Sequence, residues 1–454
     1  MSINRKIWGT ASYGNAKFNI IFVVFFTILL ATACCLHIYE DNLNGPPIRS
    51  DGFGYNSYLS SIFIDGDLSF HSALTEVSDD DLASKAYGLG PHPTTGKMFT
   101  KYLPGTALLA TPFFIAADVF AKLYKFPRTG YSTPYQVANI LSGIFYLCIG
   151  MLAIYTTLRR KYPSQIAGMV LLLVTFATNV FHYATYDGSF SHIYSFAIIS
   201  IYTLLLDQYR NSSPNRDTYY LIGLGIAIGL IAMIRLPNAI LGILALGLIV
   251  EKNLKLESRI HLFQHLAIFG IAAFISTMPL FAYWYRTSGS FIFNSYAAFP
   301  PKNGKLEGFN WTKPEIFKFL FSIDRGLFFW SPVTLLGFLG LPSLLKRDHV
   351  FPGLITLVLA VHIYICSSWW TWSFGASFAC RPFVDLMPLV SVPLATSIVT
   401  IRKKWGARWT WALIFCFISI NLILMYSYWH SYIPYTGTTL KTLENLPMNF
   451  GIEY

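Results

Sequence analysis

The sequence has little charge for its size. Asp, Glu, Lys and Arg make up 12% of its 454 residues, whereas a soluble domain carries about 25% of them. Hydrophobic residues make up 54% and aromatic residues 17%. This composition excludes an ordinary soluble protein and is typical of a polytopic membrane protein.

Several motifs that carry chemistry are also missing. The sequence has no Walker loop, no GxGxxG motif after a strand, no heptad pattern and no internal repeat, so nucleotide hydrolysis is not expected to drive its function. Its six cysteines lie in or beside apolar runs without CxxC or Cys/His ligand spacing, which favours small buried side chains over a metal centre. These motifs lead to no firm prediction of a cofactor, and a divalent metal ion stays open.

The apolar runs predict an all-α polytopic membrane protein. Roughly twelve runs approach the ~20 residues of a membrane span, so we expect about 11–13 transmembrane helices in one integral membrane domain, residues 1–454. The runs cover residues 18–37, 104–121, 134–158, 165–181, 192–206, 218–234, 237–250, 264–285, 326–345, 350–368, 386–401 and 408–430.

The distribution of charge predicts the orientation. The net charge of +11 lies in short basic clusters between spans, which indicates cytoplasmic loops rather than a nucleic-acid partner. Residues 38–103 hold nine acids against four bases and are expected to form the first extracytoplasmic loop. The loops 287–325 and 369–385 and the tail 431–454 share its side. If both runs 104–121 and 134–158 cross fully, the basic cluster 159–161 lands on the wrong side, so one of them crosses only partly.

Asp51 opens the polar stretch "SDGFGYNSYLSSIF" in this first loop. Asp51, Tyr55, Tyr58 and Ile62 follow helical spacing, which predicts a short amphipathic helix at the membrane surface with a long first loop around it. Asp51 is either the N-cap of this helix or a general base at the boundary between water and lipid. Tyr55 and Tyr58 are candidate contacts for a sugar or an acceptor.

Three cations stand at the ends of apolar runs. Lys101 precedes the break in "KYLPG", Arg235 ends a run in "IRLPN", and Arg325 follows Asp324 at a span entrance. Each of the first two either snorkels to the interface or binds an anion. Asp324 and Arg325 either pair with each other or leave the arginine for a ligand.

The stretch "FHYATYDGSFSHIYSFA" places polar groups between two spans. His182, Asp187, Ser189 and His192 are costly at membrane depth unless they are paired or functional. No GxSxG motif is present, which disfavours a nucleophilic Ser/His/Asp triad. We favour a polar patch that binds a hydroxylated or phosphorylated head group.

Residues 367–389 combine aromatic and charged side chains. Trp369, Trp370 and Trp372 either form an interfacial aromatic belt or stack on sugar faces. Arg381 and Asp385 are four residues apart, so they are either a surface ion pair or a phosphate-binding arginine oriented by a carboxylate.

Six stretches, in order along nearly the whole chain, carry a resemblance to a known group of enzymes: "SDGFGY", "KYLPG", "FSHIYSF", "IRLPN", "DRGLFFWSP" and "WWTWSFGASFACRPFVDLMP". Together the chain resembles the GT-C superfamily of polytopic glycosyltransferases, which use sugars linked to a lipid phosphate. The resemblance implies that Asp51 is the catalytic acid of the first extracytoplasmic loop. It also implies a bacterial inner membrane with a periplasmic active site.

The residue types fit this chemistry. Transfer from a polyprenyl-phosphate sugar needs a base for the acceptor hydroxyl and cations for the departing phosphate. One well-placed carboxylate, Asp51, implies direct displacement with inversion, whereas a glycoside hydrolase needs two. The expected phosphate-binding residues are Arg381, Arg235, Lys101, Arg325 and His192. The expected sugar- or acceptor-binding residues are Tyr55, Tyr58, Trp369, Trp370, Trp372, Asp187 and Asp385.

Two other functions stay open at this point. A transporter or flippase of a lipid-linked sugar would use the same arginines and tryptophans for binding alone, although such folds usually show repeats and short paired loops. A ligase or polymerase of surface glycans is the second, but its main loop comes late in the chain. The acceptor, whether a glycan, a lipid or a protein, is not predicted.

Overall fold

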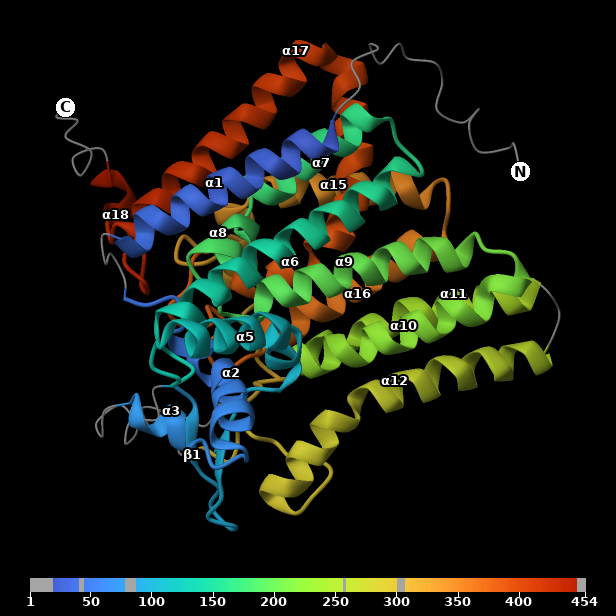
Figure 1. Cartoon of the computed structure of the whole chain (residues 1–454). Helices are drawn as coiled ribbons and strands as arrows, with labels where there is room; N and C mark the ends of the chain where they lie inside the picture. The colour runs from blue at the N-terminus through green and yellow to red at the C-terminus, as the bar shows by residue number, and fades with distance from the viewer. Residues whose placement is uncertain (1–18, 41–44, 78–86, 256–258, 300–306, 447–454) are drawn as a thin grey trace.

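The structure is a computed structural model that describes residues 19–40, 45–77, 87–255, 259–299 and 307–446, and helices dominate it (Figure 1). The longer helices are α1 (Ile20–Glu40), α5 (Gly105–Tyr124), α6 (Thr133–Arg159), α7 (Ser164–Phe176), α9 (Ser191–Arg210), α10 (Pro214–Ile234), α11 (Gly242–Lys255), α12 (Arg259–Ser288), α15 (Val333–Leu345), α16 (Val350–Ser367) and α17 (Met387–Trp429). The short helices are α2 (Ser50–Ser60), α3 (His71–Thr75), α8 (Val180–Thr185), α13 (Ile316–Phe321), α14 (Leu327–Trp330) and α18 (Leu440–Glu444).

The helices confirm the expected all-α polytopic class. Among the described residues, eight helical segments are long and apolar enough to cross a membrane, and α7 and α15 are shorter apolar helices. Helix α17 contains a non-helical residue, Gly406, whose φ of 80° divides it into two rods. A positive φ costs glycine little, so the chain reverses here between two predicted runs. Each of the twelve predicted runs contains helix.

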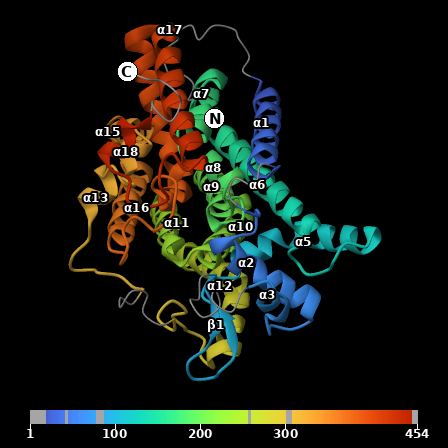
Figure 2. The ribbon, with the colours of Figure 1, turned by 90° about the vertical axis from the view of Figure 1, so that its left-hand side faces the viewer.

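Helix α5 bears on the question of which run, 104–121 or 134–158, crosses only partly. In Figure 2 it runs across the upright helices α1 and α17 instead of alongside them. A helix in this orientation need not cross the membrane. Helix α5 is also among the eight segments long and apolar enough to cross. If α5 does not cross, the run 134–158, which becomes α6, crosses alone, and the basic cluster 159–161 falls on the side that the other basic clusters require; this orientation stays a prediction.

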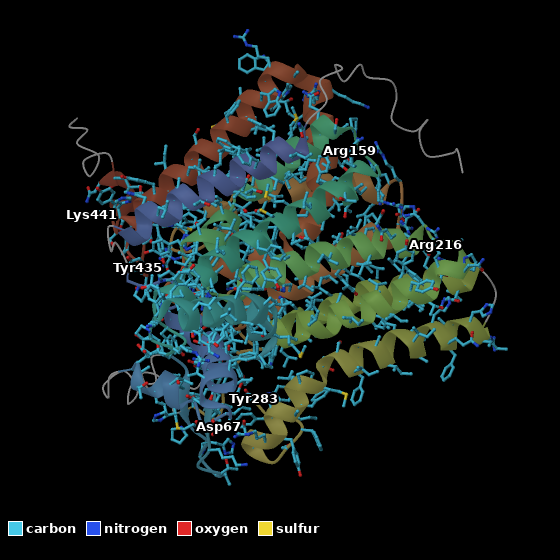
Figure 3. All side chains as sticks on the ribbon, viewed as in Figure 1. Asp67, Arg159, Arg216, Tyr283, Tyr435 and Lys441 are labelled. Atoms are coloured by element: carbon cyan, nitrogen blue, oxygen red, sulfur yellow. The ribbon has the colours of Figure 1, made fainter. Side chains whose placement is uncertain are left out.

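Polar contacts join the basic ends of the helices at one end of the bundle. Lys161 pairs with Asp207 at 2.8 Å, and Arg402 donates to Gln165 at 2.9 Å. Figure 3 shows Arg159 and Arg216 toward this end, and Asp67 and Tyr435 at the opposite end.

The opposite end holds the first loop. Two short strands, β1 (Leu89–Pro91) and β2 (Met98–Thr100), form an antiparallel hairpin in which Gly90 pairs with Phe99. Two short non-α helical turns, η2 (Leu236–Leu241) and η3 (Arg381–Leu386), precede α11 and α17, and a π-helical turn, η1 (Ser61–Asp65), follows α2. The hairpin, α2 and α3 cover this end of the bundle (Figure 1).

The predicted helix after Asp51 exists, but it is buried in the protein instead of being amphipathic with one exposed face. Every residue of α2 from Gly52 to Ser60 is buried. Two glycines allow this close packing, because a Cβ on Gly52 would lie 1.9 Å from Ser189 Oγ and one on Gly54 would lie 2.3 Å from the Tyr102 ring. Helix α2 is therefore an internal element that places Asp51 between the loop and the bundle.

Candidate active site

Asp51 lies in the first turn of α2, where it bonds two side chains from distant parts of the chain. Its Oδ1 accepts a hydrogen bond from the Tyr102 hydroxyl at 2.7 Å, and its Oδ2 accepts one from Arg381 Nη1 at 3.1 Å. The N-cap position belongs to Arg49, which makes no side-chain capping bond. The structure therefore does not support the N-cap interpretation of Asp51.

The surroundings of Asp51 keep its carboxyl group ionised. Burial raises the pKa of this carboxyl, whereas Arg381, the Tyr102 hydroxyl and Lys101 lower it, and the net result is a pKa below the ordinary value. The side chain is 22% exposed, so it is not fully enclosed.

Tyr102 is fixed on both sides. Its carbonyl accepts a hydrogen bond from the Tyr58 hydroxyl at 2.6 Å, and its ring lies 4.9 Å from that of Tyr55. Burial and the neighbouring Asp51 carboxylate raise the pKa of Tyr102 well above its usual value, so its hydroxyl stays protonated and donates. Tyr58, a predicted sugar contact, lies here as a support for Tyr102.

Lys101 lies beside Asp51 in an aromatic setting. Its Nζ pairs with Glu307 at 2.9 Å and 3.0 Å, and it lies 5.2 Å from the ring centroid of Tyr296 and 5.8 Å from that of Phe299. The side chains of Lys101 and Glu307 are 15% and 12% exposed. Lys101 is thus held against protein at its head as well as its stem, which differs from a snorkelling lysine.

Asp385 organises a second, deeper group. It bonds His192 Nδ1 at 3.0 Å, Asn238 Nδ2 at 2.7 Å and Arg235 Nε at 3.1 Å. Asp385 is fully buried, and three donors satisfy the charge that burial would otherwise penalise. Arg235 also reaches Ser191 Oγ at 3.3 Å.

The two groups are neighbours, because Arg381 begins η3 and Asp385 lies one turn later in it. The predicted pairing of Arg381 with Asp385 is nevertheless wrong: Arg381 bonds Asp51, while Asp385 bonds Arg235. The 3₁₀ turn of η3 points the two side chains to different partners. The structure brings together Asp51, Tyr55, Lys101, His192, Arg235, Arg381 and Asp385 from the predicted set.

Asp187 belongs to a third group beside this one. It accepts hydrogen bonds from His182 Nε2 at 3.0 Å and Arg49 at 3.1 Å, and Trp429 Nε1 donates to the other His182 nitrogen at 2.9 Å. Ser189 Oγ is buried and makes no hydrogen bond among the described residues. No Ser/His/Asp triad forms here.

Arg325 contacts Asp324 and the C-terminal tail rather than Asp51. It is 1% exposed, pairs with Asp324 at 3.3 Å as one interpretation expected, and donates to Thr438 Oγ1 at 2.7 Å and the Pro434 carbonyl at 2.9 Å. These contacts tie the start of α14 to the C-terminal tail.

The three predicted tryptophans differ in position. The Trp369 ring lies 5.6 Å from Tyr296, which borders Lys101, and 4.8 Å from Phe309. The backbone of Trp370 bonds Gly308 at 2.8 Å. Trp372 is half-buried against the hydrophobic core. Only Trp369 is linked to the Asp51 group through a described ring contact.

Sequence reasoning missed three residues of the site. Glu307 is a single acid in a long loop, and Asn238 follows a proline in an apolar run, so neither carries a local signal. Tyr102 follows Lys101 in "KYLPG" and was not among the predicted site residues. In the ranges that the structure describes, no three His, Cys, Asp or Glu side chains group together as a metal site.

Comparisons with known proteins identify the fold. ArnT from Cupriavidus metallidurans, in a crystal structure bound to undecaprenyl phosphate, matches with a TM-score of 0.53 and 12% identity, over 88% of this chain and 64% of ArnT. The apo oligosaccharyltransferase from Archaeoglobus fulgidus matches with a TM-score of 0.51 and 10% identity, over 96% of this chain and 57% of that one. Both are GT-C glycosyltransferases.

The chain is therefore an integral membrane protein with the GT-C fold. It spans less than two thirds of the length of either of these proteins. No protein-family model and no curated protein matches its sequence.

Proposed function

We propose that this protein is an inverting glycosyltransferase that moves a sugar from a polyprenyl-phosphate carrier to an acceptor hydroxyl. One observation carries the proposal: an ionised carboxylate, Asp51, lies beside the cations Arg381 and Lys101 at one end of a GT-C helical bundle. A base and a phosphate site are thereby adjacent, as transfer requires.

The proposed reaction is a single displacement. The acceptor oxygen attacks the anomeric carbon and forms the new glycosidic bond, while the bond from that carbon to the phosphate oxygen breaks. The phosphate leaves with the bonding electrons, and the acceptor proton passes to Asp51. Inversion follows from one attack on the face opposite the leaving group.

The cations receive the negative charge of the departing phosphate. Arg381 and Lys101 are assigned this role because their charges act on Asp51. Arg235 is assigned it because Arg235, Asp51 and Arg381 all lie around Tyr55, with His192 beside Arg235. Arg325 is not assigned to it, because its partners are the tail and Asp324. Tyr55 and Trp369 are assigned to the sugar or acceptor, since their rings border Tyr102 and Tyr296.

The site would face the extracytoplasmic side of the membrane. The basic helix ends lie at the other end of the bundle, and such clusters favour the cytoplasm. A bacterial inner membrane and an acceptor that is a glycan, a lipid or a protein are parts of the same proposal. A lipid carrier explains why the site lies at the boundary, because the tail stays among the spans while the sugar phosphate reaches water.

The test is the envelope glycan profile of the native host by mass spectrometry. A deletion strain is compared with strains that express the wild type, Asp51→Asn and the control Asp67→Asn at equal levels. We expect one sugar mass to disappear in the deletion and in Asp51→Asn, since losing a general base costs about 10²–10⁴-fold in rate. Asp67, an exposed acid that accepts from Ser69, should be replaceable.

A transporter would give another outcome. If Asp51→Asn keeps the wild-type profile while the deletion accumulates an unused lipid-linked sugar, the protein moves its ligand without reacting, and the transferase proposal is wrong.

A further inference from the structure

Three carboxylate–cation pairs meet in the site. Asp51 pairs with Arg381 at 3.1 Å, Asp385 with Arg235 at 3.1 Å, and Glu307 with Lys101 at 2.9 Å. Each cation that the proposed function assigns to the donor phosphate therefore already holds a carboxylate.

Binding of the donor would add negative charge to these three pairs. The phosphodiester of a lipid-linked sugar brings one negative charge into a site whose three pairs are neutral, and the phosphate that leaves carries about −1.5 to −2 charges at pH 7. Like charges at close range in a partly buried site are costly. Release of one carboxylate from its cation would restore the balance.

The contacts show which carboxylate can leave. Asp51 is the proposed base, so its carboxylate stays in the site whichever group Arg381 contacts. Asp385 is fully buried and bonds three side chains. Glu307 lies in the segment between α12 and α13, and the bonds that its carboxylate makes among the described residues both come from Lys101.

We propose that Glu307 holds the place of the donor phosphate on Lys101, and that donor binding exchanges the carboxylate for the phosphate. This inference rests on the proposed function and adds a residue that sets donor affinity. The aromatic wall of Tyr296 and Phe299 keeps Lys101 in position during the exchange. Glu307 thus opposes binding of the donor and of the phosphate product alike, which would favour release of the spent carrier.

The experiment measures binding of a polyprenyl phosphate without sugar to the full-length protein in nanodiscs. The variants are Glu307→Gln, Lys101→Gln, the double variant and Glu307→Asp. Glu315→Gln is the matched control, because Glu315 pairs with Lys318 at 3.1 Å farther along the same segment, where both side chains are exposed.

We expect Glu307→Gln to bind about 3–10-fold more tightly, the range for loss of a competing pair worth about 1 kcal/mol. Lys101→Gln should bind more weakly, and the double variant should show no gain over Lys101→Gln. Glu307→Asp and Glu315→Gln should match the wild type.

The outcomes separate the two proposals. If the wild type binds but Glu307→Gln binds equally or more weakly, Glu307 is a structural partner of Lys101 and the exchange is wrong, while the proposed function stands. If the wild type does not bind polyprenyl phosphate at all, the proposed function itself fails. Should Glu307→Gln lose its thermal transition, Glu307→Ala with the same control decides between these results.

Discussion

Replacement of Tyr102 by phenylalanine removes one atom from the candidate site. The hydroxyl donates to Asp51 Oδ1 at 2.7 Å, and a hydrogen bond to a charged group contributes about 1.5–3 kcal/mol. The carbonyl of residue 102 and the ring contact with Tyr55 remain, so the change acts on the carboxylate. The carboxylate loses that stabilisation relative to the carboxylic acid, and the pKa of Asp51 rises.

The sign of the pH effect follows from this. Asp51 has a lowered pKa in the folded protein, so base function is present at neutral pH and is lost as pH falls through that pKa. Tyr102→Phe should move the acid limb of kcat/KM to higher pH, with less than about a tenfold loss at pH 7, where the carboxylate stays ionised.

The assay is the pH profile of sugar transfer in membranes, for the wild type, Tyr102→Phe and the control Tyr146→Phe. Tyr146 donates to the Leu109 carbonyl at 2.8 Å, away from the site, so its replacement should lower stability without moving the limb. An acid limb that stays in place or moves to lower pH in Tyr102→Phe would refute the role of the hydroxyl.

Two further substitutions test the packing and the deep ion pair. Gly52→Ala should destabilise the protein by about 1–3 kcal/mol and lower transfer, since its Cβ would lie 1.9 Å from Ser189 Oγ and displace the neighbouring Asp51. Gly223→Ala, where the nearest atom is 3.4 Å away, should be tolerated in the same thermal melts and transfer assays. Asp385→Asn leaves Arg235 without its buried counter-charge and should cost about 3–5 kcal/mol in thermal unfolding. Asp118→Asn, which breaks a more exposed pair with Arg128, should cost about 1 kcal/mol or less; equal losses would contradict the burial argument.

The sequence was sufficient for the helices and for many of the charged residues that the structure brings together around Asp51. Apolar runs have a local signature, and a charge at the end of such a run, as at Lys101 or Arg235, stands out because its burial must be compensated. The basic cluster 159–161 was enough to predict that one of the runs 104–121 and 134–158 crosses only partly. Which of the two helices lies across the bundle depends on packing between helices.

The partners could not be predicted in the same way. Arg381 and Asp385 are four residues apart, and only the 3₁₀ geometry of η3 sends them to Asp51 and Arg235. Asp51 and Arg381 are separated by 330 positions, a pairing that local periodicity cannot contain. Glu307 carried no signal at all, because one acid in a polar loop is ordinary until the fold places it on Lys101.

The lowered pKa of Asp51 raises a question for its proposed role, because a carboxylate stabilised by Arg381 is a weak base. The donor offers a resolution on physical grounds. A bound phosphate competes for the guanidinium of Arg381, and an arginine fork suits a phosphate at least as well as one carboxylate oxygen. When Arg381 turns to the phosphate, Asp51 loses its strongest counter-charge, and its affinity for a proton increases. The ion pair would thus keep Asp51 ionised before the donor binds. Its loss on donor binding would make Asp51 a stronger base only when a leaving group is in place.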